Sequence, residues 1–301
     1  MLEKQINFIE VKKVEIMKQT GLVLEGGGSR GVYTGGVLRL LMENDIYIPY
    51  VIGVSAGACT GSSYISRQIE RNKQTTIDYA DHPDYLSFRN WWKERQLFGM
   101  DFIFDILPNK LVPFDFTTFN QANEEFVVGT TDCHTGETHF YKKSERADDM
   151  LTILRASSSL PLVAPVVQYD GYDLMDGGIT APIPINQSLS DGNKKNVVVL
   201  TQNRGYLKKP QSFIWYIKRK YGQYEGLIRA IEHRHKVYND TLQFLFEEEK
   251  KGNVFIIAPT EKLQVGRMER DKEKLTYLYK QGYQDTSALL EPLKEFLSDD
   301  A

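Results

Sequence analysis

Short apolar runs alternate with amphipathic stretches along the first two thirds of the chain. Residues 21–25 read GLVLE and residues 50–54 read YVIGV, and both runs are of a length typical of buried strands. A Gly-rich turn and a helical pattern follow the first run, and small residues with helical spacing follow the second. Further strands are expected at 125–130, 137–142, 165–175 and 196–201, and helices near 75–95 and 146–157. Strands that alternate with helices in this way predict an α/β sandwich.

The last third of the chain has a different pattern. It is mainly helical over 210–250 and 270–298, with one strand-like run, NVFIIAP at 253–259, that is expected to add an edge strand. No Pro- or Ser-rich linker precedes it. We therefore expect a catalytic core at 20–204 and a mainly helical C-terminal extension at 205–301 that packs on the core as one structural unit.

Composition narrows the class of partner. At 301 residues, 41% of them hydrophobic and 26% charged, the chain resembles a globular protein with a sizeable core. The 37 basic and 40 acidic residues nearly cancel to a net charge of −3, which gives no electrostatic reason to expect a nucleic acid as partner. Any contact with a membrane is then expected to be mainly apolar.

Cysteine usage and the apolar runs bear on localisation. Cys59 and Cys133 are too few for a disulfide framework or a zinc site, so both are expected to be buried thiols in a reducing compartment. The first 21 residues mix Glu and Lys and lack the apolar region of a secretory signal. The longest apolar runs, such as 197–200 and 254–258, fall far short of the roughly 20 residues that a membrane-spanning helix needs. These features predict a cytoplasmic protein without membrane spans.

The strongest chemical signal is GVSAG at 53–57, which joins an apolar strand to a helix of small residues. It fits the G-x-S-x-G turn in which a serine nucleophile is exposed, with Gly53 and Gly57 allowing strand and helix to approach each other. The N-terminus of the following helix favours developing negative charge. Ser55 is therefore the candidate nucleophile, against the alternative of an ordinary Gly/Ser turn.

A second signal, GGGSRG at 26–31, lies between the first strand and the first helix. Its consecutive glycines free backbone N–H groups to converge on an oxyanion, and Arg30 adds a positive charge. The same letters also fit G-x-G-x-x-G, a dinucleotide-binding pattern. That pattern expects an acidic residue about 20 positions further on, where this chain has Tyr50 to Val54. A turn chosen only for close packing is the third interpretation.

A serine nucleophile needs a base, and histidine is the usual one. The chain has five candidates, at His82, His134, His139, His233 and His235. They occur in polar turns, in a Thr-rich strand pair or on a charged helix face. None of them has a neighbouring Gly turn that would direct it to the nucleophile.

A carboxylate is the alternative base. Asp176 ends a predicted strand and is followed by Gly177 and Gly178, whereas Asp170 and Asp173 belong to YDGYD, which is strong turn chemistry. A direct Ser/Asp pair requires a short hydrogen bond and a carboxylate made more basic by burial. From these residues alone, Asp176 and a histidine both remain open as the base.

Four elements in order resemble the patatin-like phospholipase family: GGGSRG at 26–31, GVSAG at 53–57, ASSSLPLVAP at 156–165 and DGG at 176–178. The run VGRMERDKEKLTYLYKQGYQD at 265–285 is similar to the C-terminal extension of a bacterial cytoplasmic subgroup of that family. Many members carry DGA where this chain has DGG, and either small residue allows the turn.

The resemblance implies a three-layer α/β/α sandwich that hydrolyses acyl esters of lipids with a Ser-Asp dyad and no metal or organic cofactor. It implies Ser55 as nucleophile and Asp176 as proton acceptor. It further implies an oxyanion hole from the amides of Gly27 and Gly28, and Arg30 near a phosphate or acyl oxygen of the substrate. The flanking motif glycines are Gly26, Gly31, Gly53, Gly57, Gly177 and Gly178.

One segment remains to be explained, the aromatic-rich stretch at 85–116, which includes Trp91 and Trp92. It is expected either to pack in the core, as aromatic residues mostly do, or to form a lid or acyl channel with peripheral membrane contact. A non-catalytic lipid- or anion-binding module that keeps the fold is the functional alternative to a lipid or ester hydrolase.

Overall fold

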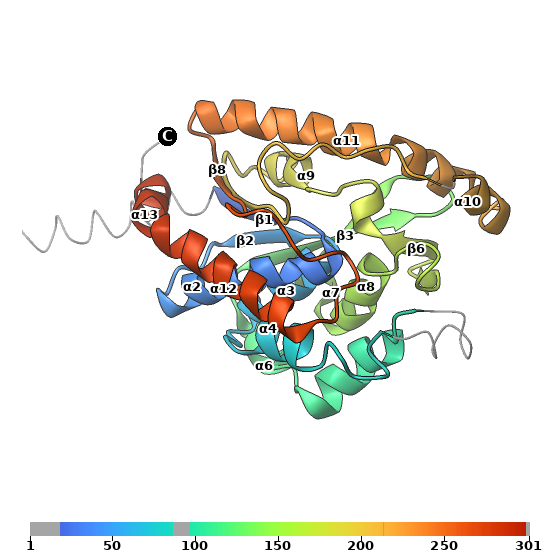
Figure 1. The fold of residues 1–301 in the computed structure, drawn as a ribbon, viewed down its shortest axis with the longest axis horizontal. Coiled ribbons are helices and arrows are strands. Elements are labelled where there is room, and N and C mark those ends of the chain that lie inside the picture. Colours follow the sequence, from blue (N-terminus) through green and yellow to red (C-terminus); the bar gives the residue numbers. More distant parts are fainter. Residues whose placement is uncertain (1–18, 87–96, 213, 299–301) are drawn as a thin grey trace, which may run out of the picture.

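The computed structural model describes residues 19–86, 97–212 and 214–298, and an eight-stranded mixed sheet runs through its middle (Figure 1). The strand order is β5–β6–β3–β2–β1–β7–β8, with β4 paired to β3. The strands are β1 (Thr20–Leu24), β2 (Tyr50–Gly53), β3 (Glu125–Asp132), β4 (Thr138–Lys142), β5 (Val167–Tyr169), β6 (Tyr172–Asp176), β7 (Lys195–Val199) and β8 (Val254–Ile257).

Helices surround this sheet. The α-helices are α2 (Val32–Glu43), α3 (Ala56–Ile65), α4 (Arg71–Lys73), α6 (Phe116–Gln121), α7 (Lys143–Arg146), α8 (Met150–Ser157), α9 (Ile185–Ser190), α10 (Ile214–Lys220), α11 (Glu225–Lys250), α12 (Lys272–Ala288) and α13 (Leu290–Ser298). Short 3-10 turns are η1 (Gly28–Gly31), η4 (Ala147–Asp149) and η5 (Gly177–Ile179), and π-helical segments are η2 (Gln74–Asp78) and η3 (Phe102–Leu111).

Five consecutive strands are parallel, in the order β3–β2–β1–β7–β8, and most of their residues are buried. Alternate side chains of each strand therefore enter two different cores. In β1, Leu22 and Leu24 face one core and Val23 faces the other; in β7, Val197 and Val198 separate in the same way. The parallel arrangement explains why these strands appear in the sequence as continuous apolar runs.

The two cores correspond to two helical layers (Figure 1). Residues of α2, α3, α8 and α12 close the first core, and residues of α9 and α11 close the second. Figure 1 shows α11 lying along one side of the sheet and α12 crossing the other. The predicted α/β/α sandwich is therefore confirmed.

Two predicted elements need correction. The strand predicted at 165–175 is a hairpin of β5 and β6, because Asp170 (φ 54°) and Gly171 (φ 81°) form a tight turn between them. The helix predicted near 75–95 is wrong in its described part, which has only the short η2 segment followed by turns around Pro83. Proline lacks a backbone N–H and disfavours a helical residue before it. Residues 87–96, with Trp91 and Trp92, lie outside the described residues.

The C-terminal extension is built into the fold at two places. Its strand β8 pairs with β7 as the predicted edge strand. Its helix α12 crosses α2 so closely that a β-carbon on Gly36 would lie 2.0 Å from the Tyr279 carbonyl oxygen. On the other helix, a β-carbon on Gly282 would lie 2.1 Å from the Tyr33 carbonyl oxygen. Both helices therefore require glycine at their crossing point.

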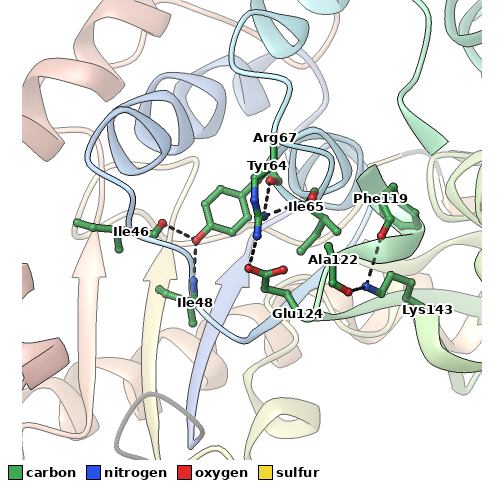
Figure 2. A network of polar contacts seen from close by, with 9 residues as sticks. All are labelled: Ile46, Ile48, Tyr64, Ile65, Arg67, Phe119, Ala122, Glu124 and Lys143. Carbon is green, nitrogen blue, oxygen red and sulfur yellow. Dashed lines mark hydrogen bonds and ion pairs between the residues drawn. The ribbon is translucent and has the colours of Figure 1, made fainter. Parts of the chain in front are cut away.

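Figure 2 shows how the far end of α3 is fixed to the segments that lead into β2 and β3. The Tyr64 hydroxyl accepts a hydrogen bond from the Ile48 N–H and donates one to the Ile46 carbonyl, both at 2.7 Å. Arg67, just beyond the helix, pairs with Glu124 beside β3. Because α3 begins at the candidate nucleophile, these contacts help to hold that end of the helix in place as well.

Candidate active site

Ser55 occupies a strained turn between β2 and α3. Its backbone has φ 53° and ψ −129°, a region that few non-glycine residues adopt and that costs of order 1–3 kcal/mol. The neighbouring glycines are required by close packing, because a β-carbon on Gly57 would lie 2.4 Å from the Leu24 carbonyl oxygen. One on Gly53 would lie 2.7 Å from the Ala58 nitrogen. The chain thus forms the sharp strand-turn-helix junction that the sequence predicts.

Ser157, at the end of α8, holds this turn from behind. The Ser55 N–H donates to Ser157 Oγ at 2.8 Å, and the Ser157 hydroxyl donates in turn to the Gly129 carbonyl at 2.7 Å. Ser157 is completely buried. Sequence reasoning missed this role, because three consecutive serines in ASSSLP do not reveal which hydroxyl faces the turn.

Asp176 lies at the end of β6 with its backbone anchored on both sides. Its N–H donates to the Ser159 carbonyl, and its carbonyl accepts from the Thr131 hydroxyl, both at 2.9 Å. The side chain is buried, and its Oδ1 accepts the Gly178 N–H at 2.8 Å. The other oxygen, Oδ2, is buried without a hydrogen-bond partner among the described residues. The carboxylate therefore has a free acceptor oxygen inside the protein.

The electrostatics of Asp176 suit a base. Burial raises the pKa of its carboxyl above the usual value, and the nearby Arg234 guanidinium, the Ser55 hydroxyl and the Gly178 N–H oppose this rise. The Ser55 hydroxyl is thus close enough to influence the pKa of the carboxyl, although no hydrogen bond of standard geometry reaches Oδ2.

The glycine loop at 26–31 packs directly against this turn. A β-carbon on Gly26 would lie 3.2 Å from the Ser55 β-carbon, and one on Gly31 would lie 2.6 Å from the Ala56 β-carbon. Gly28 has φ 59°, which favours glycine. The structure therefore places the glycine loop against the Ser55 turn, and Gly28 lines the same cavity as Ser55.

The turn after the loop is covered by the C-terminal extension. The Ser29 N–H donates to the Arg267 carbonyl at 2.9 Å, and the Ser29 hydroxyl is within 3.1 Å of the Glu269 carbonyl. A β-carbon on Gly28 would lie 2.5 Å from the same Arg267 oxygen. Because the chain itself fills this position, the geometry disfavours a dinucleotide pyrophosphate there.

Arg30 is not among the residues that line the cavity at Ser55. Its Nε is buried without a hydrogen-bond partner in the described chain. Burial lowers the pKa of its guanidinium, the Glu25 carboxylate raises it, and Arg267 lowers it further. Arg30 therefore belongs electrostatically to a group of charges beside the glycine loop.

A cavity of about 150 Å³ opens at Ser55. Much of its wall is apolar and comes from the aromatic-rich segment, including Phe98, Met100, Phe104 and Leu107. None of the five histidines lines it. The described part of 85–116 therefore forms a wall of the cavity at the candidate nucleophile and also packs around it.

Fold and site together define an α/β protein with an elbow serine that lines an apolar cavity and a buried aspartate close to that serine. The patatin-like phospholipase profile matches residues 22–189, so the chain belongs to the patatin-like phospholipase family. A second profile, a domain of unknown function called DUF6363, matches residues 224–298. The extension thus has a profile of its own.

Several curated proteins are similar to this chain. The Escherichia coli protein named "Uncharacterized protein YjjU" is 25% identical over 80% of this chain and 69% of its own length. Human patatin-like phospholipase domain-containing protein 4 is 26% identical over 56% of this chain and 68% of its own length. Lysophospholipase NTE1 of Cryptococcus neoformans is 28% identical over 61% of this chain but only 11% of that protein.

Among solved structures, VipD from Legionella pneumophila matches with a TM-score of 0.51. The match covers 91% of this chain and 67% of VipD at 13% sequence identity, and so it bears on the fold alone. Within the described ranges, no helix is both long and apolar enough to span a bilayer. The same ranges contain no group of three or more His, Cys, Asp or Glu side chains suited to a metal ion.

Proposed function

We propose that this protein is a serine acyl hydrolase that cleaves carboxylic ester bonds of lipids through Ser55 and Asp176. The observation that carries the proposal is the unpartnered Oδ2 of Asp176, buried beside the Ser55 hydroxyl at the end of an apolar cavity. A buried acceptor without a donor is costly, and a serine hydroxyl at this position would supply the donor. Membership of a phospholipase family supports the same chemistry.

In the first half-reaction, Ser55 Oγ attacks the ester carbonyl carbon while its proton passes to Asp176 Oδ2. The negative charge that develops on the carbonyl oxygen would be met by the N–H groups of Gly27 and Gly28, with the positive end of α3 adding to the stabilisation. Each such donor typically contributes about 3 kcal/mol in the transition state. The C–O bond to the alcohol then breaks, and Asp176 gives the proton to the oxygen of the leaving alcohol.

In the second half-reaction, Asp176 takes a proton from a water molecule as that water attacks the acyl-enzyme carbonyl. The bond between Ser55 Oγ and the acyl carbon breaks, and Oγ takes the proton back from Asp176. A fatty acid is released and both side chains return to their starting state. These steps use only groups of the chain, and the acyl group occupies the apolar cavity.

The segment 85–116 is proposed to bring this cavity to a lipid surface. Leu111 and Phe116, near its end, are both exposed. Exposed apolar side chains beside a substrate cavity suit shallow contact with acyl chains. Sedimentation of the protein with neutral phospholipid vesicles tests this contact, and a protein that stays wholly in the supernatant would contradict it.

Hydrolysis of short p-nitrophenyl esters tests the dyad. We expect Ser55→Ala and Asp176→Asn each to lower kcat by at least about a thousandfold, because each removes a group that acts only with the other. Asp173→Asn is the matched control: Asp173 lies on the same strand but bonds to Tyr224 and His134 instead. Substantial turnover by either dyad variant would disprove the mechanism.

Labelling by a fluorophosphonate separates this function from a non-catalytic lipid- or anion-binding module. A fluorophosphonate reacts with an activated serine, so we expect covalent modification of Ser55 in the wild type and none in Ser55→Ala. Folded wild-type protein that binds lipid without becoming labelled would indicate the binding module.

A further inference from the structure

A second cavity, of about 340 Å³, lies beside the glycine loop and has a wall made largely of cations. Lys208, Lys209, Arg234, His235 and Arg267 line it together with Tyr206. No carboxylate is among its lining residues. All of these residues belong to the C-terminal extension, outside the four motifs.

Hydrogen bonds to other parts of the chain hold three of these residues, Arg234, Arg267 and Lys208. Arg234 donates from Nε to the Gly178 carbonyl at 2.6 Å. Arg267 is fixed through its own carbonyl, which accepts the Ser29 N–H. The backbone of Lys208 exchanges two hydrogen bonds with the Asn239 side chain, at 2.8 and 3.0 Å. The guanidinium of Arg234 is therefore fixed directly, and the backbones of Lys208 and Arg267 are fixed beside it.

The charges of the cluster are only partly compensated. Two buried carboxylates act on them: Asp176, which lies near Arg234, and Glu25, whose oxygens already accept the Thr201 N–H at 2.5 Å and the Tyr238 hydroxyl at 2.9 Å. Over the described ranges, no ion pair within 4 Å involves Lys208, Arg234 or Arg267. A cluster in which the cationic side chains outnumber the nearby carboxylates attracts an anion.

Geometric and electrostatic observations agree with anion binding in this cavity. The Nδ1 of His235, whose side chain lines the cavity, is buried without a hydrogen-bond partner. Burial, together with the charges of Arg234 and Arg267, lowers the pKa of Lys208 to about 7. Burial and Arg267 likewise lower the pKa of Arg234 to about 10. An anion bound between these groups would stabilise their charged forms.

We propose that this cavity binds a phosphate group, and that the phosphate belongs to the ester substrate. This assignment rests on the proposed hydrolase function and names the class of substrate within it: phosphate-bearing lipid esters in preference to neutral acylglycerols. One arginine guanidinium group can donate two parallel hydrogen bonds to two oxygens of a phosphate, and a phosphate carries enough negative charge to match several cations.

The position of the cavity suits a substrate headgroup. Arg234 bonds to the carbonyl of Gly178, whose N–H in turn binds Asp176 Oδ1. The short segment 267–269 borders both cavities, because Arg267 lines the cationic one and Glu269 lines the one at Ser55. An ester held at Ser55 can thus place its acyl chain in one cavity and its alcohol side toward the other.

Binding of inorganic phosphate, measured by calorimetry on Ser55→Ala, tests the site without catalysis. We expect saturable binding that Arg267→Gln or Lys208→Met, added to Ser55→Ala, weakens roughly tenfold or more, since each removes a charge-assisted contact. Lys236→Met is the matched control, because Lys236 is exposed on α11 next to His235. Melting curves show whether each variant is folded. Phosphate binding by the Ser55→Ala parent tests the site even where one of the added substitutions prevents folding.

A substrate pair separates a lipid headgroup from free phosphate as the occupant. Monohexanoylglycerol phosphate and monohexanoylglycerol share one acyl ester, and we compare the ratio of their kcat/KM values. If the phosphate is a headgroup, Arg267→Gln and Lys208→Met lower this ratio roughly tenfold or more. Phosphate binding without any change in the ratio would overturn the headgroup assignment and leave free phosphate as the ligand.

The failure of the site and the failure of the hydrolase are distinguishable. No saturable binding of phosphate at millimolar concentration, together with an unchanged ratio, would overturn the phosphate site while hydrolysis continues. No hydrolysis of either ester by the wild type would overturn the proposed function, and the calorimetry on Ser55→Ala would still report on the phosphate site.

Discussion

Ser157 offers a test of how the strained nucleophile turn is maintained. Its hydroxyl links the Ser55 N–H to the Gly129 carbonyl, at 2.8 and 2.7 Å, inside a completely buried environment. Ser157→Ala removes both hydrogen bonds and little volume. The variant therefore isolates the polar contact from the packing.

The cost follows from the two groups left unpaired. A buried donor or acceptor without a partner costs about 1–3 kcal/mol of stability. The cost is smaller for the Gly129 carbonyl than for the Ser55 N–H, because the carbonyl oxygen has a second lone pair. We expect Ser157→Ala to lower the free energy of unfolding by about 2–4 kcal/mol, so the protein stays folded. The strain at Ser55 is then less well opposed, and a displacement of the nucleophile by about 1 Å can lower the rate about a hundredfold.

Urea unfolding and p-nitrophenyl ester hydrolysis measure the two effects. Ser159→Ala is the matched control, because the equally buried Ser159 hydroxyl donates at 2.9 Å to the Arg155 carbonyl, which also accepts the Ser158 N–H. We expect that variant to lose less than about 1 kcal/mol. If Ser157→Ala matches Ser159→Ala in both stability and kcat, the Ser55 turn does not depend on this hydroxyl.

Three further changes test the site and the packing around it. Burial raises the pKa of Asp176, so ionisation of its carboxyl destabilises the folded wild type as the pH rises through that pKa. The melting temperature of Asp176→Asn should therefore exceed that of the wild type by more at pH 7 than at pH 4. A difference in melting temperature that becomes smaller as the pH rises would contradict this. The base must be ionised, so kcat/KM should fall at low pH, with a midpoint above the usual pKa range of aspartate. Arg234→Met removes a charge that lowers the pKa of Asp176, so it should move this midpoint to higher pH. An unchanged midpoint would exclude the proposed effect of Arg234 on Asp176. Gly28→Ala, at φ 59° and facing the Arg267 carbonyl, should lower kcat at least about tenfold and stability by about 1–2 kcal/mol, to be checked by ester hydrolysis and thermal melts; wild-type values in both would remove the need for glycine there.

The local features of the site could be predicted from sequence because they depend on near neighbours. The Ser55 turn is specified by glycines two residues away on either side and by the apolar strand before it. Asp176 is marked by the two glycines that follow it. Choosing it over a histidine needed a family resemblance, because nothing in the local residues states which base faces the serine.

The contacts that escaped prediction are tertiary. Ser157 reaches Ser55 across 102 positions of sequence, and Arg234 reaches Gly178 across 56. Lys208 and Arg267 come together only when the extension folds against the core, and in the sequence they look like ordinary surface charges. The wrong helix near 75–95 came from periodicity that Pro83 interrupts.

The crossing of α2 and α12 has a consequence for how this protein can change over generations. Gly36 and Gly282 lie in segments matched by two different family profiles, yet each leaves room only for the backbone of the other's helix. If a gene fusion replaced only one of the two segments, the new segment would need a glycine at the same crossing point. Without that glycine the two helices could not pack as closely. Because α12 follows directly on the segment that covers the glycine loop, the inheritance of the candidate catalytic motifs is tied to two glycines that lie outside the candidate site.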